Sequence, residues 1–334
     1  MRNLVTVQRV RSISQIPDSD FLELAHIMGW QCVVKKGEFK AGDLGVYYEV
    51  DSFLPVEERY EFLRNSSYRD NADNGQGFRI RTVKMRGQLS QGLLLPLEKF
   101  PELAGYSEGG DVTEKLNVKK WYIPETATPG GVIIGDKPGG VPTSDEIRLQ
   151  SALELLDQLT GKPYYITTKM DGTSGTVYYI DGKIGCCSRN KEIKDEADAL
   201  YWMPVYAYGL KEKLARYGKN IVLTGEICGP GIQKNKLRLQ KFEWYVFDVF
   251  DRDSRRYFSY DMLCEICSGL GLQIVPLEER GESFAYNLET LLEKARGKYP
   301  SGLDKEGIVV RDAASPKGIS FKVLNNDALL KEKE

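Results

Sequence analysis

The residues Lys169, Met170, Asp171 and Gly172 place an amine, a carboxylate and a flexible backbone position within four residues. They follow Tyr164–Thr168, whose aromatic and β-branched side chains predict a short strand. Because side chains alternate along a strand, Lys169 and Asp171 point to the same face. Gly172 has no Cβ, so the backbone can turn or approach a ligand closely there. This group suits nucleophilic catalysis by an amine, but the same spacing is also typical of a surface ion pair without chemistry.

Four later segments with strand character each carry one charged or aromatic residue. They are Ile221–Cys228 with Glu226, Trp244–Phe250 with Phe247, the strand that starts at Glu306, and Ile319–Leu324 with Lys322. Each segment taken alone fits an ordinary buried strand. Their order along the chain is much harder to explain by chance.

That order resembles the covalent nucleotidyltransferases, a superfamily of DNA ligases, RNA ligases and mRNA-capping guanylyltransferases. The matching motifs are Lys169-x-Asp171-Gly172, Ser188-Arg189-Asn190, Gly225-Glu226, Phe247-Asp248, Glu306-Gly307 and Phe321-Lys322-Val323. The stretch from Glu226 to Lys234 is particularly similar to RNA ligases. DNA ligases and capping enzymes carry an OB domain after the last motif, whereas only Asn325–Glu334 follow it here. The resemblance therefore favours an ATP-dependent RNA ligase of the subfamily with an N-terminal OB domain.

The resemblance implies a role for each matching residue. Lys169 is the nucleophile that attacks the α-phosphate of ATP, so that pyrophosphate leaves and a lysyl-adenylate remains. The implied catalytic residues are Lys169, Lys322 and Arg148, and the implied nucleotide contacts are Thr168, Asp171, Gly172, Arg189, Glu226, Phe247, Glu306 and Lys322. Phe247 occupies the position that stacks on adenine in the family, and Tyr245 is the alternative.

A divalent cation, Mg²⁺ or Mn²⁺, is also implied. Asp171, Glu226 and Glu306 carry the hard oxygen ligands that such a cation binds, and Mg²⁺ keeps several waters, so contact through water is expected. A lysine with a pKa near ~10.4 must lose its proton before it can attack. Positive charge from the cation, Lys322 and Arg148 would favour that loss.

One departure from the family pattern concerns the last motif. Many members carry two lysines two residues apart, and here the first of these positions is Ser320. Lys322 is therefore expected to act without that partner, or Lys317 to reach in from the preceding loop. The sequence therefore leaves two alternatives for the phosphate contacts but predicts one residue, Lys169, as the nucleophile.

Residues 1–120 read as short strands of a small OB-type barrel that binds nucleic acid. The predicted strands are Leu4–Ile13, Phe21–Met28, Gly45–Val50, Phe78–Arg86 and Gly92–Leu97, with Arg64–Gly77 as an exposed loop. The basic residues predicted to contact nucleic acid are Arg79, Arg81, Lys84 and Arg86. The alternative is a barrel that only supports the neighbouring domain.

The predicted fold class is α+β, with the OB-type barrel followed by an adenylyltransferase domain of antiparallel sheets flanked by helices, similar to ATP-grasp-like ligases. Residues 121–142 are rich in Gly and Pro and predict a linker or excursion, so the adenylyltransferase domain covers 143–334. Thr143 and Glu146 have capping-box spacing and predict a helix from that point. Further helices are predicted near Asp195–Tyr217, Tyr260–Leu270 and Leu288–Lys298.

The composition argues against a generally basic nucleic-acid-binding protein, a membrane or secreted protein, and a zinc protein. The 334 residues carry a net charge of −2, so any nucleic-acid site must be a local basic patch. No apolar segment is long enough to span a membrane and no signal peptide is evident, which predicts an intracellular protein that is not secreted. The six cysteines and the single His26 do not supply four ligands at zinc spacing, so no zinc site is expected and the cysteines predict a reducing compartment.

The predicted function is an ATP-dependent RNA ligase that joins 5′-phosphate and 3′-OH ends. The expected partner is RNA or an RNA-containing nicked duplex, with ribose at the 3′-OH, bound by a monomer. A DNA ligase or an mRNA-capping guanylyltransferase is the alternative enzyme. An RNA-binding protein with a retired ligase domain is the alternative without activity, and the intact set of Lys169, Asp171, Glu226, Glu306 and Lys322 argues against it.

Overall fold

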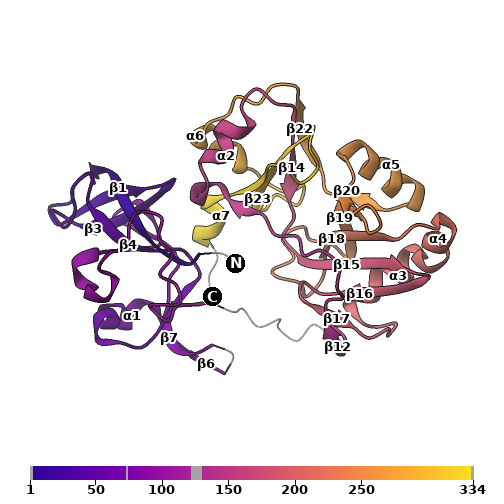
Figure 1. Cartoon of the computed structure of the whole chain (residues 1–334), viewed down its shortest axis with the longest axis horizontal. Helices are drawn as coiled ribbons and strands as arrows, with labels where there is room; N and C mark the ends of the chain where they lie inside the picture. The colour runs from indigo at the N-terminus through magenta and orange to yellow at the C-terminus, as the bar shows by residue number, and fades with distance from the viewer. Residues whose placement is uncertain (1–2, 73, 122–129, 332–334) are drawn as a thin grey trace. The chain divides into compact units, whose positions relative to one another are not determined.

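The computed structural model describes residues 3–72, 74–121 and 130–331. These residues form two compact units, each built mainly from β-sheets (Figure 1). The N-terminal unit comprises the described residues up to 121 together with Gln150–Ala152. The C-terminal unit comprises the described residues 130–149 and 153–331.

A curved five-stranded sheet forms the centre of the N-terminal unit, in the order β10-β4-β1-β2-β3. Its strands are β1 (Val5–Gln15), β2 (Leu22–Ile27), β3 (Trp30–Lys35), β4 (Leu44–Tyr48) and β10 (Leu93–Pro96). All neighbouring pairs are antiparallel. The predicted strands near residues 4–13, 21–28, 45–50 and 92–97 are confirmed within a few residues at their ends.

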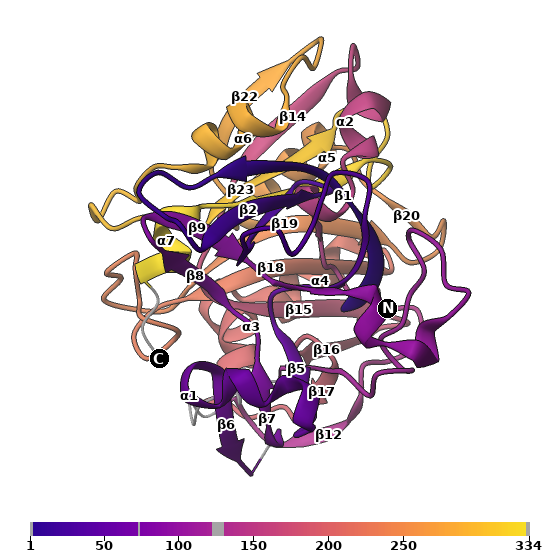
Figure 2. The same cartoon turned by 90° about the vertical axis from the view of Figure 1, so that its left-hand side faces the viewer.

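A smaller sheet and a hairpin complete this unit. The remaining elements are β5 (Ser52–Leu54), α1 (Arg64–Ser67), β6 (Tyr68–Asn71), β7 (Gly75–Arg79), β8 (Thr82–Met85), β9 (Gln88–Gln91) and β11 (Lys119–Lys120), with 3-10 helices at Glu58–Leu63, Leu97–Lys99 and Pro101–Leu103. The four-stranded sheet has the order β11-β5-β7-β6, and β8 and β9 form a two-stranded hairpin. In Figure 2 the β8–β9 hairpin lies apart from β5, β6 and β7.

Two predictions for this region are wrong. The segment 64–77 is not a loop, because it forms α1, β6 and the start of β7, with the Tyr68 ring packed edge-on against Phe78. The predicted strand 78–86 is two strands. The chain leaves the four-stranded sheet after Arg79, where Ile80 exchanges backbone hydrogen bonds with Asp51 and Ser52, and then begins the hairpin.

The larger sheet of the C-terminal unit has eight strands. Its order is β12-β17-β16-β15-β18-β19-β20, with β21 also paired to β19. The strands are β12 (Ile133–Asp136), β15 (Thr173–Ile180), β16 (Lys183–Cys187), β17 (Lys191–Ile193), β18 (Ile221–Cys228), β19 (Glu243–Asp251), β20 (Arg256–Tyr257) and β21 (Gln273–Ile274). The helices α3 (Met203–Tyr208), α4 (Leu210–Tyr217) and α5 (Tyr260–Leu270) bury their apolar sides against this sheet (Figure 1).

The second sheet of the C-terminal unit has five strands in the order β13-β24-β23-β14-β22. The strands are β13 (Ile147–Arg148), β14 (Tyr164–Lys169), β22 (Leu277–Gly281), β23 (Gly307–Asp312) and β24 (Ser320–Leu324), with helices α2 (Glu154–Leu159), α6 (Leu288–Ala295) and α7 (Asn326–Lys331). A separate core around Phe284 and Phe321 lies between this sheet, α2 and α6. The predicted helix 260–270 is confirmed, and the helices near 195–217 and 288–298 are present but shorter.

The helix predicted from Thr143 is wrong. Residues 141–146 are extended and lead into β13, which pairs in parallel with β24. Glu146, the acidic residue of the predicted capping box, instead accepts hydrogen bonds from Arg311 and Lys317, and the neighbouring Ser144 donates to Asp248. Helical structure begins with a 3-10 helix at Leu149–Ser151, which α2 follows. The predicted linker 121–142 also contains β12, paired with β17, while its residues 122–129 lie outside the described residues.

The core around Phe284 generates a stability prediction. Phe284 is fully buried, and its ring lies 5.3 Å from the Tyr164 ring and 6.5 Å from the Phe321 ring, both edge-on. Phe284→Ala should lower the free energy of unfolding by about 3–5 kcal/mol, because the lost ring leaves a cavity. The matched control is Met262→Ala on α5, where the side chain is 40% exposed and a change within about 0.5 kcal/mol is expected. Urea unfolding followed by circular dichroism measures both, and equal effects would contradict this core.

Candidate active site

Lys169 lies at the end of β14 and is held by Glu306. The register of β14 with β23 places Lys169 opposite Gly307, so Glu306 stands beside the amine. The Lys169 Nζ lies 2.8 and 2.9 Å from the two carboxylate oxygens of Glu306. Tyr299 fixes the pair, since its hydroxyl donates to the Lys169 carbonyl at 2.6 Å and accepts from the Glu306 N–H at 3.1 Å. Nothing in the sequence pattern pointed to Tyr299.

Two further cations lie on the same face of the five-stranded sheet. Lys322 on β24 pairs with Val309, which in turn pairs with Thr167, two residues before Lys169. Arg148 on β13 is the parallel partner of Lys322. Because paired residues share a face and side chains alternate, Lys169, Lys322 and Arg148 point to one side. Burial lowers the pKa of Lys322, and the charges of Lys169 and Arg148 lower it further.

The eight-stranded sheet contributes Glu226. Gly172 packs directly on the backbone of β18, where a Cβ would come within 2.3 Å of the Ile227 carbonyl oxygen, so only glycine permits this approach. A backbone hydrogen bond from Gly172 reaches the Glu226 carboxylate. Burial, together with the charges of Glu306 and Asp171, raises the pKa of Glu226 to about 7. The close packing of Gly172 on β18 therefore brings Glu226 next to the segment Lys169–Gly172.

The carboxylates keep the amine of Lys169 charged. Burial by itself lowers the pKa of Lys169, but the carboxylates of Glu306, Glu226 and Asp171 raise it more strongly, so the pKa lies above its ordinary value. In the ligand-free protein at neutral pH, Lys169 thus holds its proton. An attack by this amine requires that positive charge first offset the carboxylates.

Asp171 pairs with Lys236, a contact that sequence reasoning missed. The Lys236 Nζ lies 3.0 Å from the Asp171 carboxylate, and both side chains are largely buried. Burial and the charge of Glu306 raise the pKa of Asp171, while Lys236 opposes that rise. Among the described residues, no three His, Cys, Asp or Glu side chains form a group that could hold a metal directly. The oxygen ligands of Asp171, Glu226 and Glu306 suit Mg²⁺ or Mn²⁺ bound through water, and this set stays a prediction.

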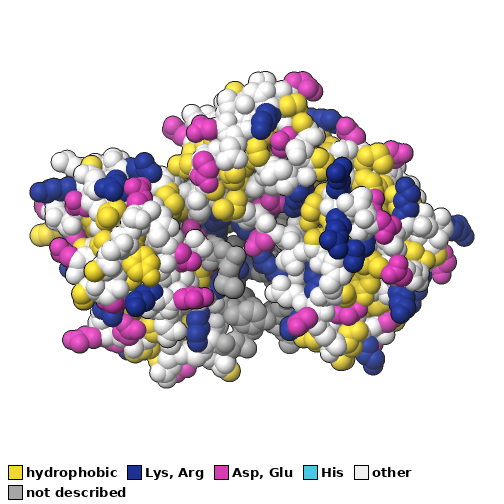
Figure 3. Space-filling view, in the orientation of Figure 1, with side chains coloured by type: hydrophobic (Ala, Val, Ile, Leu, Met, Phe, Trp, Pro, Cys, Tyr) yellow, Lys and Arg dark blue, Asp and Glu magenta, His cyan; other side chains and the backbone are white. Residues whose placement is uncertain are grey.

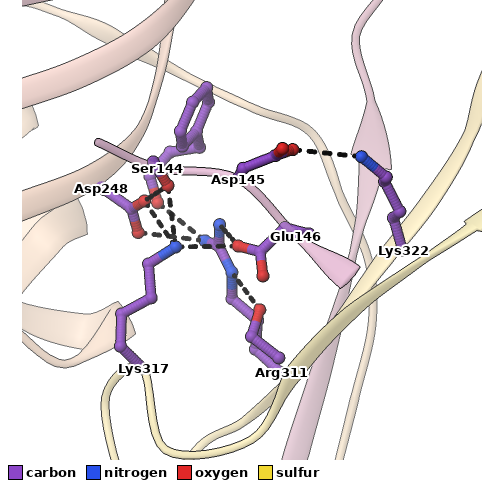
Figure 4. A network of polar contacts seen from close by, with 9 residues as sticks. Ser144, Asp145, Glu146, Asp248, Arg311, Lys317 and Lys322 are labelled. Carbon is purple, nitrogen blue, oxygen red and sulfur yellow. Dashed lines mark hydrogen bonds and ion pairs between the residues drawn. The ribbon is translucent and has the colours of Figure 1, made fainter. Parts of the chain in front are cut away.

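The extended segment 144–146 carries side chains that join several of the predicted site residues (Figure 4). Asp145 forms ion pairs with Lys322, at 3.1 Å, and with Arg189 from the loop between β16 and β17. Lys317 extends from the loop before β24, and its Nζ lies 2.8 Å from both Glu146 and Asp248, with which it forms ion pairs. The alternative that Lys317 contacts phosphate stays a prediction.

Two other predicted nucleotide contacts have different surroundings. The Thr168 hydroxyl donates to Glu278 at 2.8 Å, on the strand face opposite to Lys169. The half-buried ring of Phe247 packs with Met170, which follows the nucleophile, in a small apolar cluster. Tyr245, the alternative to Phe247, belongs to the same cluster.

The basic residues of the N-terminal unit do not share one strand. Arg79, on β7, lies with its guanidinium 5.1 Å from the Trp121 ring centroid. Arg81 connects β7 to β8. Lys84 and Arg86 are exposed on the β8–β9 hairpin, whose turn at Arg86 has a positive φ. Lys84 and Arg86 are therefore the members of this set best placed to meet a ligand from solvent.

Comparison with known proteins identifies both units. An OB-fold domain profile matches residues 4–97, and the RNA ligase profile matches residues 162–324. The RNA ligase of Naegleria gruberi solved with PPi is 34% identical, with a TM-score of 0.93, and the match covers 99% of each chain. The chain belongs to the RNA ligase family.

Further structures of the Naegleria gruberi RNA ligase match equally well. A lysine-to-alanine mutant solved with ATP and Mn is 34% identical, with a TM-score of 0.93, over 98% of this ligase and 99% of that chain. A glutamate-to-alanine mutant solved with AMP and Mn is 34% identical, with a TM-score of 0.93, over 99% of each chain. A search of curated protein sequences returned no match.

These findings confirm the predicted family and the predicted fold class. The N-terminal unit is an OB-fold domain with a half-barrel sheet, and the ligase domain consists of antiparallel sheets with helices. In the part of the ligase that the structure describes, no helix has the length and apolarity needed to cross a membrane.

Glu226 makes the stability of the ligand-free ligase depend on pH. Its pKa is about 7 in the folded protein, against 4.5 for an ordinary glutamate, so the folded protein binds its proton more tightly than the unfolded chain does. The free energy of unfolding therefore falls between about pH 4.5 and about pH 7, and this loss stays constant at higher pH. Glu226→Gln removes this loss and should raise the free energy of unfolding by up to about 3 kcal/mol at pH 8, with little gain at pH 4.5. Urea titrations across this pH range measure the gain, and a gain that does not vary with pH would contradict the assignment.

Proposed function

We propose that this ligase uses ATP to join a 5′-phosphate to a 3′-OH in RNA, in three nucleotidyl-transfer steps. The Lys169 Nζ forms a bond to the α-phosphorus of ATP as the bond to pyrophosphate breaks. The AMP then passes to a 5′-phosphate and frees Lys169. Finally the 3′-OH attacks that phosphate and AMP leaves. The observation that carries the proposal is Lys169 held against Glu306, with Lys322 and Arg148 on the same sheet face.

The residues of the site divide this work. Glu306 orients the Lys169 amine, and Lys322 and Arg148 offer positive charge to the phosphates of ATP. Arg189, now paired with Asp145, is a further phosphate contact, and Phe247 stacks on the adenine. Asp171, Glu226 and Glu306 would hold Mg²⁺ or Mn²⁺ through water, and the bound cation would supply positive charge that favours deprotonation of the amine and departure of pyrophosphate.

The two units are proposed to divide recognition from chemistry. Residues 1–120 bind nucleic acid, 121–142 connect, and 143–334 carry the adenylyltransferase. Lys84 and Arg86 on the β8–β9 hairpin, with Arg79 and Arg81 beside it, contact phosphates of the RNA. On the face shown in Figure 3, acidic and basic side chains are interspersed, and a group of Lys and Arg lies over β19 and β20. Arg255 in the turn between these strands and Arg256 at the start of β20 are both exposed. Such local patches suit an RNA partner despite the net charge of −2.

The ligase is proposed to act as a monomer inside the cell. Both sheets that carry site residues belong to one chain, so a single copy assembles the site. All six cysteines are free thiols, as expected in a reducing compartment.

Replacement of the nucleophile tests the proposed function. Lys169→Ala should abolish covalent labelling of the protein by α-labelled ATP with Mg²⁺ or Mn²⁺, because no amine remains at the α-phosphate. Sealing of a strand that is already adenylylated should persist, since that step does not use the lysine. The matched control is Lys183→Ala, an exposed lysine on β16, which should label like wild type. An acid-labile protein–AMP adduct in Lys169→Ala would overturn the assignment.

The nature of the 3′ end separates RNA from DNA sealing. We propose that the strand supplying the 3′-OH must end in ribose, at nicks in duplexes, while the 5′-phosphate strand is less restricted. A site that bonds the 2′-hydroxyl leaves polar groups unpaired when deoxyribose binds, at about 1–3 kcal/mol for each contact. One or two contacts slow sealing by roughly ten- to a few-hundred-fold.

The measurement is single-turnover sealing by adenylylated ligase of matched nicks that differ only in the terminal 3′ sugars. Substrates with identical 5′-phosphate strands provide the control. Rates within about threefold of each other correspond to less than one contact and would favour a DNA ligase instead.

A further inference from the structure

Phe247 occupies an irregular position in the eight-stranded sheet. Along the β18–β19 ladder, Gly225 pairs with Val246 but the preceding Thr224 pairs with Asp248, so Phe247 is the extra residue of a β-bulge. The carbonyl of a bulge residue has no partner in the ladder and must find one elsewhere. That partner is Arg311, whose Nη1 donates to the Phe247 carbonyl oxygen at 2.8 Å.

Arg311 comes from the other sheet of the same unit. It lies on β23, where it pairs with Tyr165 of β14, four residues before Lys169. Its guanidinium carbon lies 5.9 Å from the centroid of the Phe247 ring. The side chain is only 5% exposed, and its remaining donors reach Glu146 at 2.9 Å and Ser320 at 3.3 Å. Arg311 thus ties the strand bearing the base-stacking candidate to the sheet that bears the nucleophile.

The cluster around Arg311 is balanced in charge (Figure 4). Arg311 and Lys317 face the two carboxylates Glu146 and Asp248, with Ser144 donating to Asp248 at 2.5 Å. Burial opposes the ionisation of Glu146, but Arg311 and Lys317 outweigh it and hold the pKa of that carboxyl below its ordinary value. Burial likewise opposes the charge of Arg311, and the two carboxylates overcome it and raise its pKa. Glu146 and Arg311 are therefore both charged at neutral pH, and the guanidinium is held by hydrogen bonds to Phe247, Glu146 and Ser320.

We propose that Arg311 is a positioning residue for adenine recognition, which fixes the bulge at Phe247 at the correct distance from Lys169. The inference rests on the proposed use of ATP. A planar guanidinium can donate to the Phe247 carbonyl and to Glu146 together, whereas a lysine ammonium at the same position is a point charge on a shorter side chain. Arg311→Lys therefore keeps the charge balance of the cluster and loses the tie to the bulge.

The test compares the ATP and tripolyphosphate dependence of lysyl-adenylate formation by Arg311→Lys and wild-type ligase. KM for ATP should rise about tenfold, the effect of one hydrogen bond to a charged group, while kcat stays within about threefold. Inhibition by inorganic tripolyphosphate, which has no base, should stay within about twofold. The matched control is Arg280→Lys, which makes the same change at an arginine that pairs with Asp261 outside this cluster. Its KM for ATP and its inhibition by tripolyphosphate should both stay near wild type.

Other outcomes overturn the proposal. Unchanged KM for ATP in Arg311→Lys, or equal losses for ATP and tripolyphosphate, would mean that Arg311 only stabilises the fold. If Arg311→Lys does not fold, the double variant Arg311→Gln with Glu146→Gln removes one charge of each sign and must show the same selective loss. If wild-type protein forms no lysyl-adenylate, the proposed function fails, and equilibrium binding of ATP and of tripolyphosphate to the same variants still decides the role of Arg311.

Discussion

The antiparallel pairing of β14 with β23 is the constraint on which the rest of the site depends. This register sets Lys169 opposite Gly307 and so places Glu306 against the amine. Gly307 has a φ of +151°, and a Cβ there would lie 2.2 Å from the Val323 carbonyl oxygen, so another residue would push β24 away. Because β23 also pairs with β24 and so holds Lys322, one strand positions Lys169, Glu306 and Lys322 relative to one another.

The electrostatics of the site explain why it needs a bound cation before it can react. Three carboxylates surround Lys169 and keep it protonated. Burial and the charge of Glu306 also raise the pKa of Asp171, and burial with the charges of Glu306 and Asp171 raises that of Glu226. An excess of negative charge in a partly buried site is unfavourable by itself. The carboxylates that keep the Lys169 amine protonated are also the groups suited to hold a divalent cation through water.

The departure at Ser320 has a structural counterpart in the buried cluster. Ser320 accepts a hydrogen bond from Arg311, and Lys317 occupies the space between Glu146 and Asp248. A lysine at position 320 would bring a third cation to two carboxylates. The small hydroxyl of Ser320 instead accepts a hydrogen bond from Arg311. A serine at this position therefore fits the cluster that contacts Phe247.

The sequence by itself determined the parts of this protein that depend on local pattern and on motif order. The strands that carry the motifs, β14, β18, β19, β23 and β24, and the helix α5 were predicted, because side-chain alternation and helical spacing are local properties. The roles predicted for Lys169 and the carboxylates came from motif order. The segment 143–146 was predicted to begin a helix because Thr143 and Glu146 have capping-box spacing. In the folded protein, polar side chains of this segment instead bind distant partners. Those partners, Asp248, Arg311 and Lys317, lie more than one hundred residues away along the chain. The contacts of Tyr299, Lys236 and Arg311 were decided only by the tertiary structure. A single tyrosine, lysine or arginine has no distinguishing neighbours in the sequence, and its partner comes within hydrogen-bonding distance only when the chain folds.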